Sequence, residues 1–137
     1  MEKEKEMKIK TKKIRQTVII KASPDEVYSA LTNPKKHSEF TGDKANGTDK
    51  LGPFSTFSGY AHGKNLKLIE GKKIVQTWTS EDFPKKHYSE ATFDLKKDKK
   101  GTKLVFTQKN VPEDSYADVS KGWEDYYWKP LKKMLEK

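Results

Sequence analysis

The side chains best suited to chemistry in this 137-residue chain begin with three histidines. His37, His62 and His87 are spaced about 25 residues apart, in stretches rich in turn-forming residues. Metal sites usually pair two ligands at short spacing, and the chain contains no cysteine, the other common zinc ligand. The sequence therefore predicts surface histidines near turns and no metal site. Only His62, in the segment GYAHGK, is expected beside a groove, where it would contact a ligand.

Acidic residues are the next candidates, because catalysis needs either a nucleophile beside a base or two carboxylates at a useful separation. Glu90 and Asp94 share one face of a predicted strand, opposite Phe93, so solvent is their expected neighbour. The sequence has no Gly-x-Ser-x-Gly motif and no phosphate-binding loop. We therefore predict a non-enzymatic protein with no cofactor. An enzyme of cyclase or hydrolase type stays open as an alternative, without residues that favour it.

Three glutamines, Gln16, Gln76 and Gln108, lie in phase with large apolar residues on predicted strands. A buried amide must be hydrogen-bonded, and internal partners are its commonest solution. If a cavity lies beside them instead, the glutamines become polar anchors for a ligand. The candidate ligand-binding residues are then Gln76, Trp78, Phe93, Phe106, Gln108, Trp123, Tyr126 and Tyr127. The aromatic members of this set can equally be packed core.

A C-terminal helix must position many of these side chains. On a helix of about 100° per residue, the apolar residues from residue 116 onward fall on one side and the charged residues on the other. The apolar side comprises Tyr116, Val119, Trp123, Tyr126, Tyr127, Pro130, Leu131 and Met134. Pro130 removes one helical hydrogen bond and is expected to bend the helix after Tyr126.

The rest of the chain predicts the sheet that covers this helix. One strand precedes a short helix, for which Ser23, Pro24 and Glu26 form a capping-box pattern, and a second short helix follows Asn33. From residue 43 to residue 111, alternating strands are separated by turns such as Glu70-Gly71-Lys72. The predicted fold is α+β: a curved antiparallel sheet wrapped around a long C-terminal helix, with two short helices after the first strand. A charged tail at residues 1–12 precedes a single domain at 13–137.

The amino-acid composition limits the classes of partner that the chain is expected to bind. The formal charge is +9, but of 29 basic residues only Arg15 is an arginine, and lysine pairs are spread along the whole chain. This pattern favours a solvated lysine surface over a nucleic-acid site, for which arginine is the better ligand. The sequence shows no signal peptide and no membrane-spanning segment, so we expect a cytoplasmic monomer.

Three segments resemble a known family: GPFSTFSGYAHGKNLKL, GKKIVQTWTSEDFPKKHYSEATFDL and NVPEDSYADVSKGWEDYYWKPLKKML. They are similar to the C-terminal domain of the activator of the ninety-kilodalton heat-shock chaperone's ATPase, within the helix-grip superfamily of START and birch-pollen-allergen-like domains. The likeness runs from about residue 13 onward. The matching positions are Gly59, Gly63, Trp78, Pro112, Gly122, Trp123 and Tyr127.

This resemblance implies a helix-grip fold and docking on that chaperone. The alternative is a carrier or sensor of a small apolar ligand, such as a lipid, sterol or flavonoid, in the groove between sheet and helix. Two departures from the family pattern matter. A charged tail stands where the activator has its N-terminal domain, so we expect little ATPase stimulation by this chain alone. Trp78-Thr79 also replaces a frequent tryptophan-arginine pair.

Overall fold

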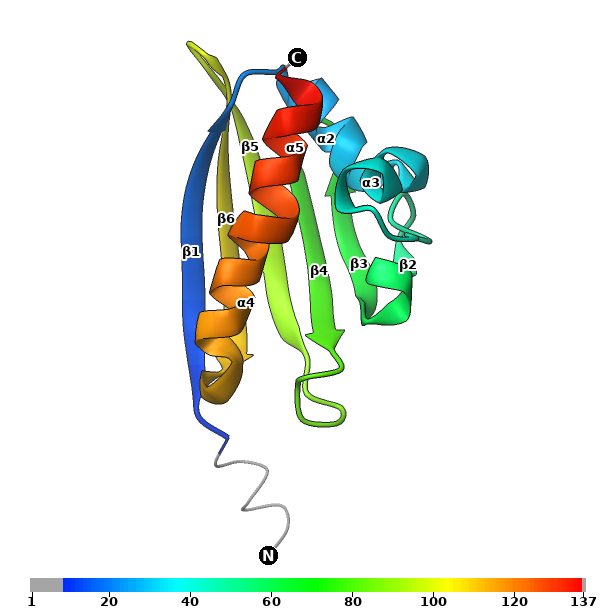
Figure 1. The fold of residues 1–137 in the computed structure, drawn as a ribbon, viewed down its shortest axis with the longest axis vertical. Coiled ribbons are helices and arrows are strands. Elements are labelled where there is room, and N and C mark those ends of the chain that lie inside the picture. Colours follow the sequence, from blue (N-terminus) through cyan, green and yellow to red (C-terminus); the bar gives the residue numbers. More distant parts are fainter. Residues whose placement is uncertain (1–8, 137) are drawn as a thin grey trace, which may run out of the picture.

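A single six-stranded antiparallel sheet, with its helices on one face, forms the domain (Figure 1). The computed structural model describes residues 9–136, so residues 1–8 of the expected charged tail lie outside the described part. The sheet order is β1-β6-β5-β4-β3-β2. The strands are β1 (Thr11–Ile20), β2 (Gly52–Thr56), β3 (Ala61–Ile69), β4 (Lys73–Ser80), β5 (Ser89–Asp98) and β6 (Gly101–Pro112). The predicted α+β helix-grip architecture is confirmed.

Two short helices, α2 (Pro24–Thr32) and α3 (Pro34–Thr41), follow the first strand as predicted. The capping box is present: the Glu26 backbone N–H donates to Ser23 Oγ at 3.2 Å, and the Ser23 N–H donates to Glu26 Oε1 at 3.3 Å. These bonds satisfy backbone donors that a helix start otherwise leaves free. Helix α2 buries Val27, Ala30 and Leu31 and so closes one end of the core.

Strand alternation places one face of the sheet inward. Phe93 pairs with Phe106 across β5 and β6, and Ile74 pairs with Phe93 across β4 and β5. All three side chains are buried. The turn at Gly71, with φ of +69°, joins β3 to β4 at the predicted place. The other face of the sheet carries the intervening residues, which are exposed or half-buried apart from Thr79.

The C-terminal helix crosses the inner face of the sheet (Figure 1). It starts with a 3-10 turn, η2 (Glu113–Ser115), and continues as α4 (Tyr116–Trp123), a π-helical stretch η3 (Glu124–Trp128) and α5 (Lys129–Leu135). At the end of η3 the Lys129 N–H donates to the Glu124 carbonyl, five residues back. The irregularity thus lies just before Pro130, which has no N–H to donate.

This π-helical stretch changes which side chains face the sheet. In a regular α-helix Tyr126 would lie on the face of Trp123, but a wider turn rotates the following residues by part of a turn. Tyr126 is 63% exposed, whereas Trp128 is only 4% exposed. The prediction that Tyr126 belongs to the covered face was therefore wrong. Trp128, which the regular projection left out, is a core residue.

Aromatic rings fill the space between the helix and the sheet. The Trp123 ring lies 4.3 Å from the Phe106 ring and 4.4 Å from the Tyr127 ring, centroid to centroid. Trp128 stacks on Trp123 at 5.8 Å and 22°. Rings of this size supply large buried areas in a chain with 32% hydrophobic residues.

Candidate functional site

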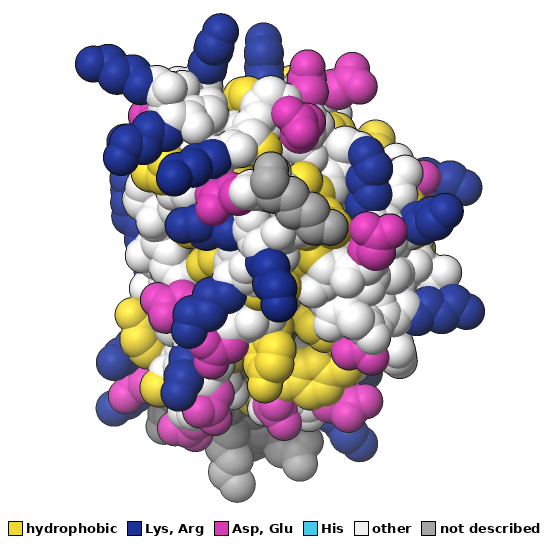
Figure 2. Space-filling view, turned by 45° about the horizontal axis from the view of Figure 1, so that its top comes forward, with side chains coloured by type: hydrophobic (Ala, Val, Ile, Leu, Met, Phe, Trp, Pro, Cys, Tyr) yellow, Lys and Arg dark blue, Asp and Glu magenta, His cyan; other side chains and the backbone are white. Residues whose placement is uncertain are grey.

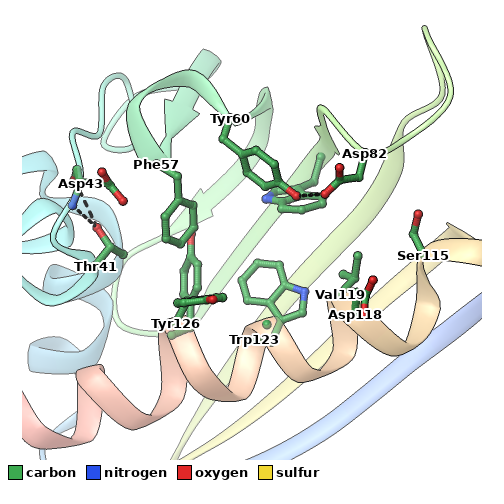
Figure 3. A pocket seen from close by; sticks show the side chains of 13 residues that line it. Thr41, Asp43, Phe57, Tyr60, Asp82, Ser115, Asp118, Val119, Trp123 and Tyr126 are labelled. Carbon is green, nitrogen blue, oxygen red and sulfur yellow. Dashed lines mark hydrogen bonds between the residues drawn. The ribbon is translucent and has the colours of Figure 1, made fainter.

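A groove of about 500 Å³ opens beside this aromatic core, between the α4–η3 part of the helix and the ends of β2, β3 and β4 (Figure 3). We call it the helix groove. Its residues are mostly aromatic, acidic or small. They are Thr41, Asp43, Phe57, Tyr60, Trp78, Asp82, Ser115, Asp118, Val119, Gly122, Trp123, Tyr126 and Tyr127.

One wall of the groove is the short segment η1 (Phe57–Gly59), which follows β2. Phe57 and Ser58 have φ of +52° and +55°, a left-handed conformation that is rare for a bulky residue. The segment is held in place because the Ser58 N–H donates to the Lys44 carbonyl at 2.9 Å. Phe57 is thereby placed 6.3 Å from Tyr126 and 5.7 Å from Tyr127, ring to ring. Strain retained at such a position is typical of binding sites.

The floor of the groove is formed by Trp78 and Trp123, whose rings lie 5.7 Å apart. A buried chain of hydrogen bonds fixes Trp123. Its Nε1–H donates to Gln108 Oε1 at 2.8 Å, and Gln108 Nε2 donates to Ser89 Oγ at 2.9 Å. Ser89 Oγ then donates to the Trp78 carbonyl at 2.7 Å. The Trp78 Nε1 is buried and has no hydrogen-bond partner among residues 9–136.

The predicted ligand-binding residues divide into two groups. Trp78, Trp123, Tyr126 and Tyr127 line the helix groove, as the carrier hypothesis requires. The other four predicted residues, Gln76, Phe93, Phe106 and Gln108, are not part of its lining. Within this second group, Gln76 and Phe93 border a separate void of about 10 Å³, whereas Phe106 and Gln108 are fully buried in the core.

The three glutamines are satisfied within the protein, which was the favoured interpretation of their pattern. Gln76 Nε2 donates to Asn65 Oδ1 at 2.8 Å. Gln16 Nε2 donates to the Ser120 carbonyl at 2.9 Å, and Gln16 Oε1 accepts the Trp128 Nε1–H at 2.6 Å. These amides therefore connect strands to one another and to the C-terminal helix.

Nine of the thirteen lining residues were not in the predicted set. Those with a ring or a charge come from loops, short turns and the helix surface: Asp43, Phe57, Tyr60, Asp82 and Asp118. No strand or helix period places a side chain in such loops and turns. Phe57 and Tyr60 flank Gly59, one of the family-matching positions, so that glycine was the one available signal. Gly59 has φ of +96° and makes the left-handed turn that presents both rings.

The prediction that His37 is a surface histidine is wrong. It is 3% exposed, its Nδ1 lies 2.9 Å from the Leu31 carbonyl, and its Nε2 lies 3.0 Å from the Tyr127 hydroxyl. Burial lowers the pKa of His37 to about 4 and raises the pKa of Tyr127. Both groups are therefore neutral near pH 7 and join α3 to the C-terminal helix. His62 is exposed and is not part of the groove lining.

The helix groove is lined by acidic side chains, whereas the chain as a whole is basic. Asp43, Asp82 and Asp118 line it, whereas no lysine or arginine among residues 9–136 does. The Tyr60 hydroxyl donates a hydrogen bond to Asp82 at the rim. Burial, with this bond as a second cause, raises the pKa of Tyr60. Figure 2 shows apolar side chains gathered on the helix-bearing side with acidic side chains beside them.

Among residues 9–136, no three His, Asp or Glu side chains come together as a metal-ion site would require. Within the same range, no helix has both the length and the apolar content needed to cross a membrane.

Comparison with known proteins decides the family. Residues 21–136 match the family described as "Activator of Hsp90 ATPase homolog 1-like protein". The chain belongs to this family. Trp78 and Trp123, at the floor of the groove, both lie within the matched residues.

Named relatives agree with this assignment. An "Activator of 90 kDa heat shock protein ATPase homolog" of Dictyostelium discoideum is 30% identical over 83% of this chain and 30% of its own length. An uncharacterized protein of Schizosaccharomyces pombe is 32% identical over 93% of this chain and 38% of its own length. The chain thus spans well under half of these relatives.

Solved structures show the same fold. A Plasmodium falciparum HSP90 activator superposes with a TM-score of 0.80 at 23% identity, covering 92% of this chain and 96% of that one. The Aha1 dimer of Colwellia psychrerythraea gives 0.78 at 26% identity, covering 91% and 96%. The monomeric state expected for this chain stays a prediction.

Proposed function

We propose that this chain is a non-enzymatic, cytoplasmic binding module that docks on the ninety-kilodalton heat-shock chaperone. The observation that carries the proposal is its membership of the activator-homologue family over residues 21–136. The Dictyostelium relative is named as a homologue of the activator of the same chaperone, which supports the same partner. Because the chain covers only part of such relatives, docking is proposed without ATPase stimulation.

The outer face of the sheet is the surface that we assign to docking. Strand alternation directs seven basic side chains to this face: Arg15, Lys64, Lys67, Lys73, Lys96, Lys103 and Lys109. Three acidic side chains of the described strands, Glu90, Asp94 and Asp98, accompany them, and Asp94 is paired with Lys73 at 3.5 Å. A shallow hollow of about 450 Å³ lies on this face, and the charged residues that line it are Lys67, Lys73, Lys109 and Glu90. Such a surface favours an acidic partner.

A binding titration with purified chaperone tests the proposal. Attraction between exposed charges is screened beyond about 10 Å at 0.1 M salt and about 3 Å at 1 M. Binding should therefore be measurable at low salt and should weaken strongly at high salt. ATPase turnover, followed in parallel, should change little. Strong stimulation by this chain alone would contradict the assigned role.

Charge-reversal variants locate the contact. The double variant Lys67→Glu, Lys109→Glu changes the outer face by four charges, and we expect it to lower affinity at low salt by at least about tenfold. The matched control Lys132→Glu, Lys133→Glu makes the same change on α5, where both lysines lie in the last turn. If both pairs weaken binding equally, net charge rather than the outer face is responsible. No binding at low salt would refute docking itself.

A second candidate function is the carriage of a small ligand, and the helix groove favours it. The volume of about 500 Å³ lies within the range of small-molecule sites. Binding here should raise the melting temperature and change tryptophan emission, because Trp78 and Trp123 flank the site.

A further inference from the structure

The charge of the helix groove narrows the class of ligand that it can hold. Among residues 9–136, its lining combines six aromatic side chains with three aspartates and includes no lysine or arginine. This arrangement stands out in a chain with a formal charge of +9. An anionic lipid or a carboxylate ligand would meet only like charge at the mouth.

Two of the aspartates lie at the same end of the groove. Asp82 follows β4 and Asp118 belongs to α4, and Figure 3 shows them on either side of that end, near Ser115. Asp43 lies toward the opposite end, near Thr41. None of the three forms an ion pair among residues 9–136. The end between Asp82 and Asp118 is thus negatively charged and open to a cation.

Aromatic faces next to these carboxylates add to the attraction. A cation held over the face of tryptophan or tyrosine is stabilised by the ring's quadrupole, and this contribution grows when solvent is excluded. Trp123 and Tyr60 lie beside the acidic end, as Figure 3 shows. The remaining rings extend from there toward Phe57 and give the groove an apolar lining.

We propose that the helix groove binds an amphiphilic organic cation, with its protonated amine between Asp82 and Asp118 and its flat apolar body along the aromatic floor. This proposal rests on the second candidate function and names the ligand class for it. The site is separate from the outer face of the sheet.

A matched set of three probes tests the charge preference: naphthalene carrying an aminomethyl, a hydroxymethyl or a carboxylate group. Calorimetric titration at 0.1 M salt should give the amine a Kd at least about tenfold below that of the alcohol. The carboxylate should bind most weakly. The amine should also raise the melting temperature by the largest amount.

Variants assign the preference to particular residues. In the double variant Asp82→Asn, Asp118→Asn, the amine and the alcohol should bind within about threefold of each other, while the alcohol's Kd is unchanged. The matched control Asp98→Asn removes a half-buried carboxylate in the β5–β6 hairpin and should leave the preference intact.

Each of the other possible outcomes overturns a different part of the proposal. An alcohol that binds as tightly as the amine refutes the charge preference but leaves the carrier function standing. An amine preference that survives in the double variant refutes the assignment to Asp82 and Asp118. No binding by any of the three probes refutes the proposal, and it leaves docking on the chaperone unaffected.

Discussion

Trp123 joins the helix to the sheet, so its truncation should be the most damaging single change to the domain. The side chain is 3% exposed and contacts the rings of Phe106 and Tyr127. Removing a buried tryptophan ring costs about 3–5 kcal/mol through lost contacts and the cavity left behind. Trp123→Ala also leaves Gln108 Oε1 without its donor, and an unpaired buried acceptor costs about 1–3 kcal/mol. We expect a total loss of about 5 kcal/mol in the free energy of unfolding.

Urea denaturation followed by far-ultraviolet circular dichroism measures this loss without relying on tryptophan emission. A loss of this size can unfold a domain outright, because native stability is commonly about 5–15 kcal/mol. The milder Trp123→Phe keeps a ring and removes the N–H, and should cost about 1–3 kcal/mol. Combined with Gln108→Met in a double-mutant cycle, it should show a coupling of at least about 1 kcal/mol. A loss below about 1 kcal/mol for Trp123→Ala would refute the packed helix–sheet interface.

Two further predictions concern a buried histidine and two glycines. Because burial lowers the pKa of His37 from 6.5 to about 4, the unfolded chain binds a proton there that the folded chain does not. The free energy of unfolding should fall by about 3 kcal/mol between pH 7 and pH 4, and His37→Gln should reduce that fall in parallel urea titrations. Gly63→Ala places a Cβ 1.9 Å from the Thr77 carbonyl and should cost more than about 2 kcal/mol, whereas Gly122→Ala should gain up to about 1 kcal/mol. Equal melting temperatures for the two alanine variants would contradict this account.

The sheet and its short helices could be predicted because their signals are local. Alternation of apolar residues on β4, β5 and β6 indicated which side chains point inward, and Ser23 with Glu26 marked the start of α2. In each case the inward face depends only on period and neighbouring residues.

The candidate site was harder to predict for three physical reasons. The π-helical stretch at 124–128 breaks the period of about 100° per residue. A regular helical projection therefore placed Tyr126 on the covered face and left Trp128 out. His37 is buried by a partner 90 positions away, Tyr127, and no local pattern reports that contact. The aspartates at the groove lie in loops or on an exposed helix surface, where side-chain direction is set by tertiary packing. Fold and groove position were thus accessible from the sequence, whereas the charge of the groove was not.

Docking on the chaperone through the outer face of the sheet is tested most directly by amide chemical-shift mapping. The ¹⁵N-labelled chain is titrated with unlabelled chaperone at low salt. We predict that shifts and line broadening concentrate on the outer face, at Val75, Thr92 and Thr107, with Gly122 and Tyr126 in the helix groove unchanged. Perturbation confined to the groove, or no perturbation at any chaperone concentration, would contradict the assignment.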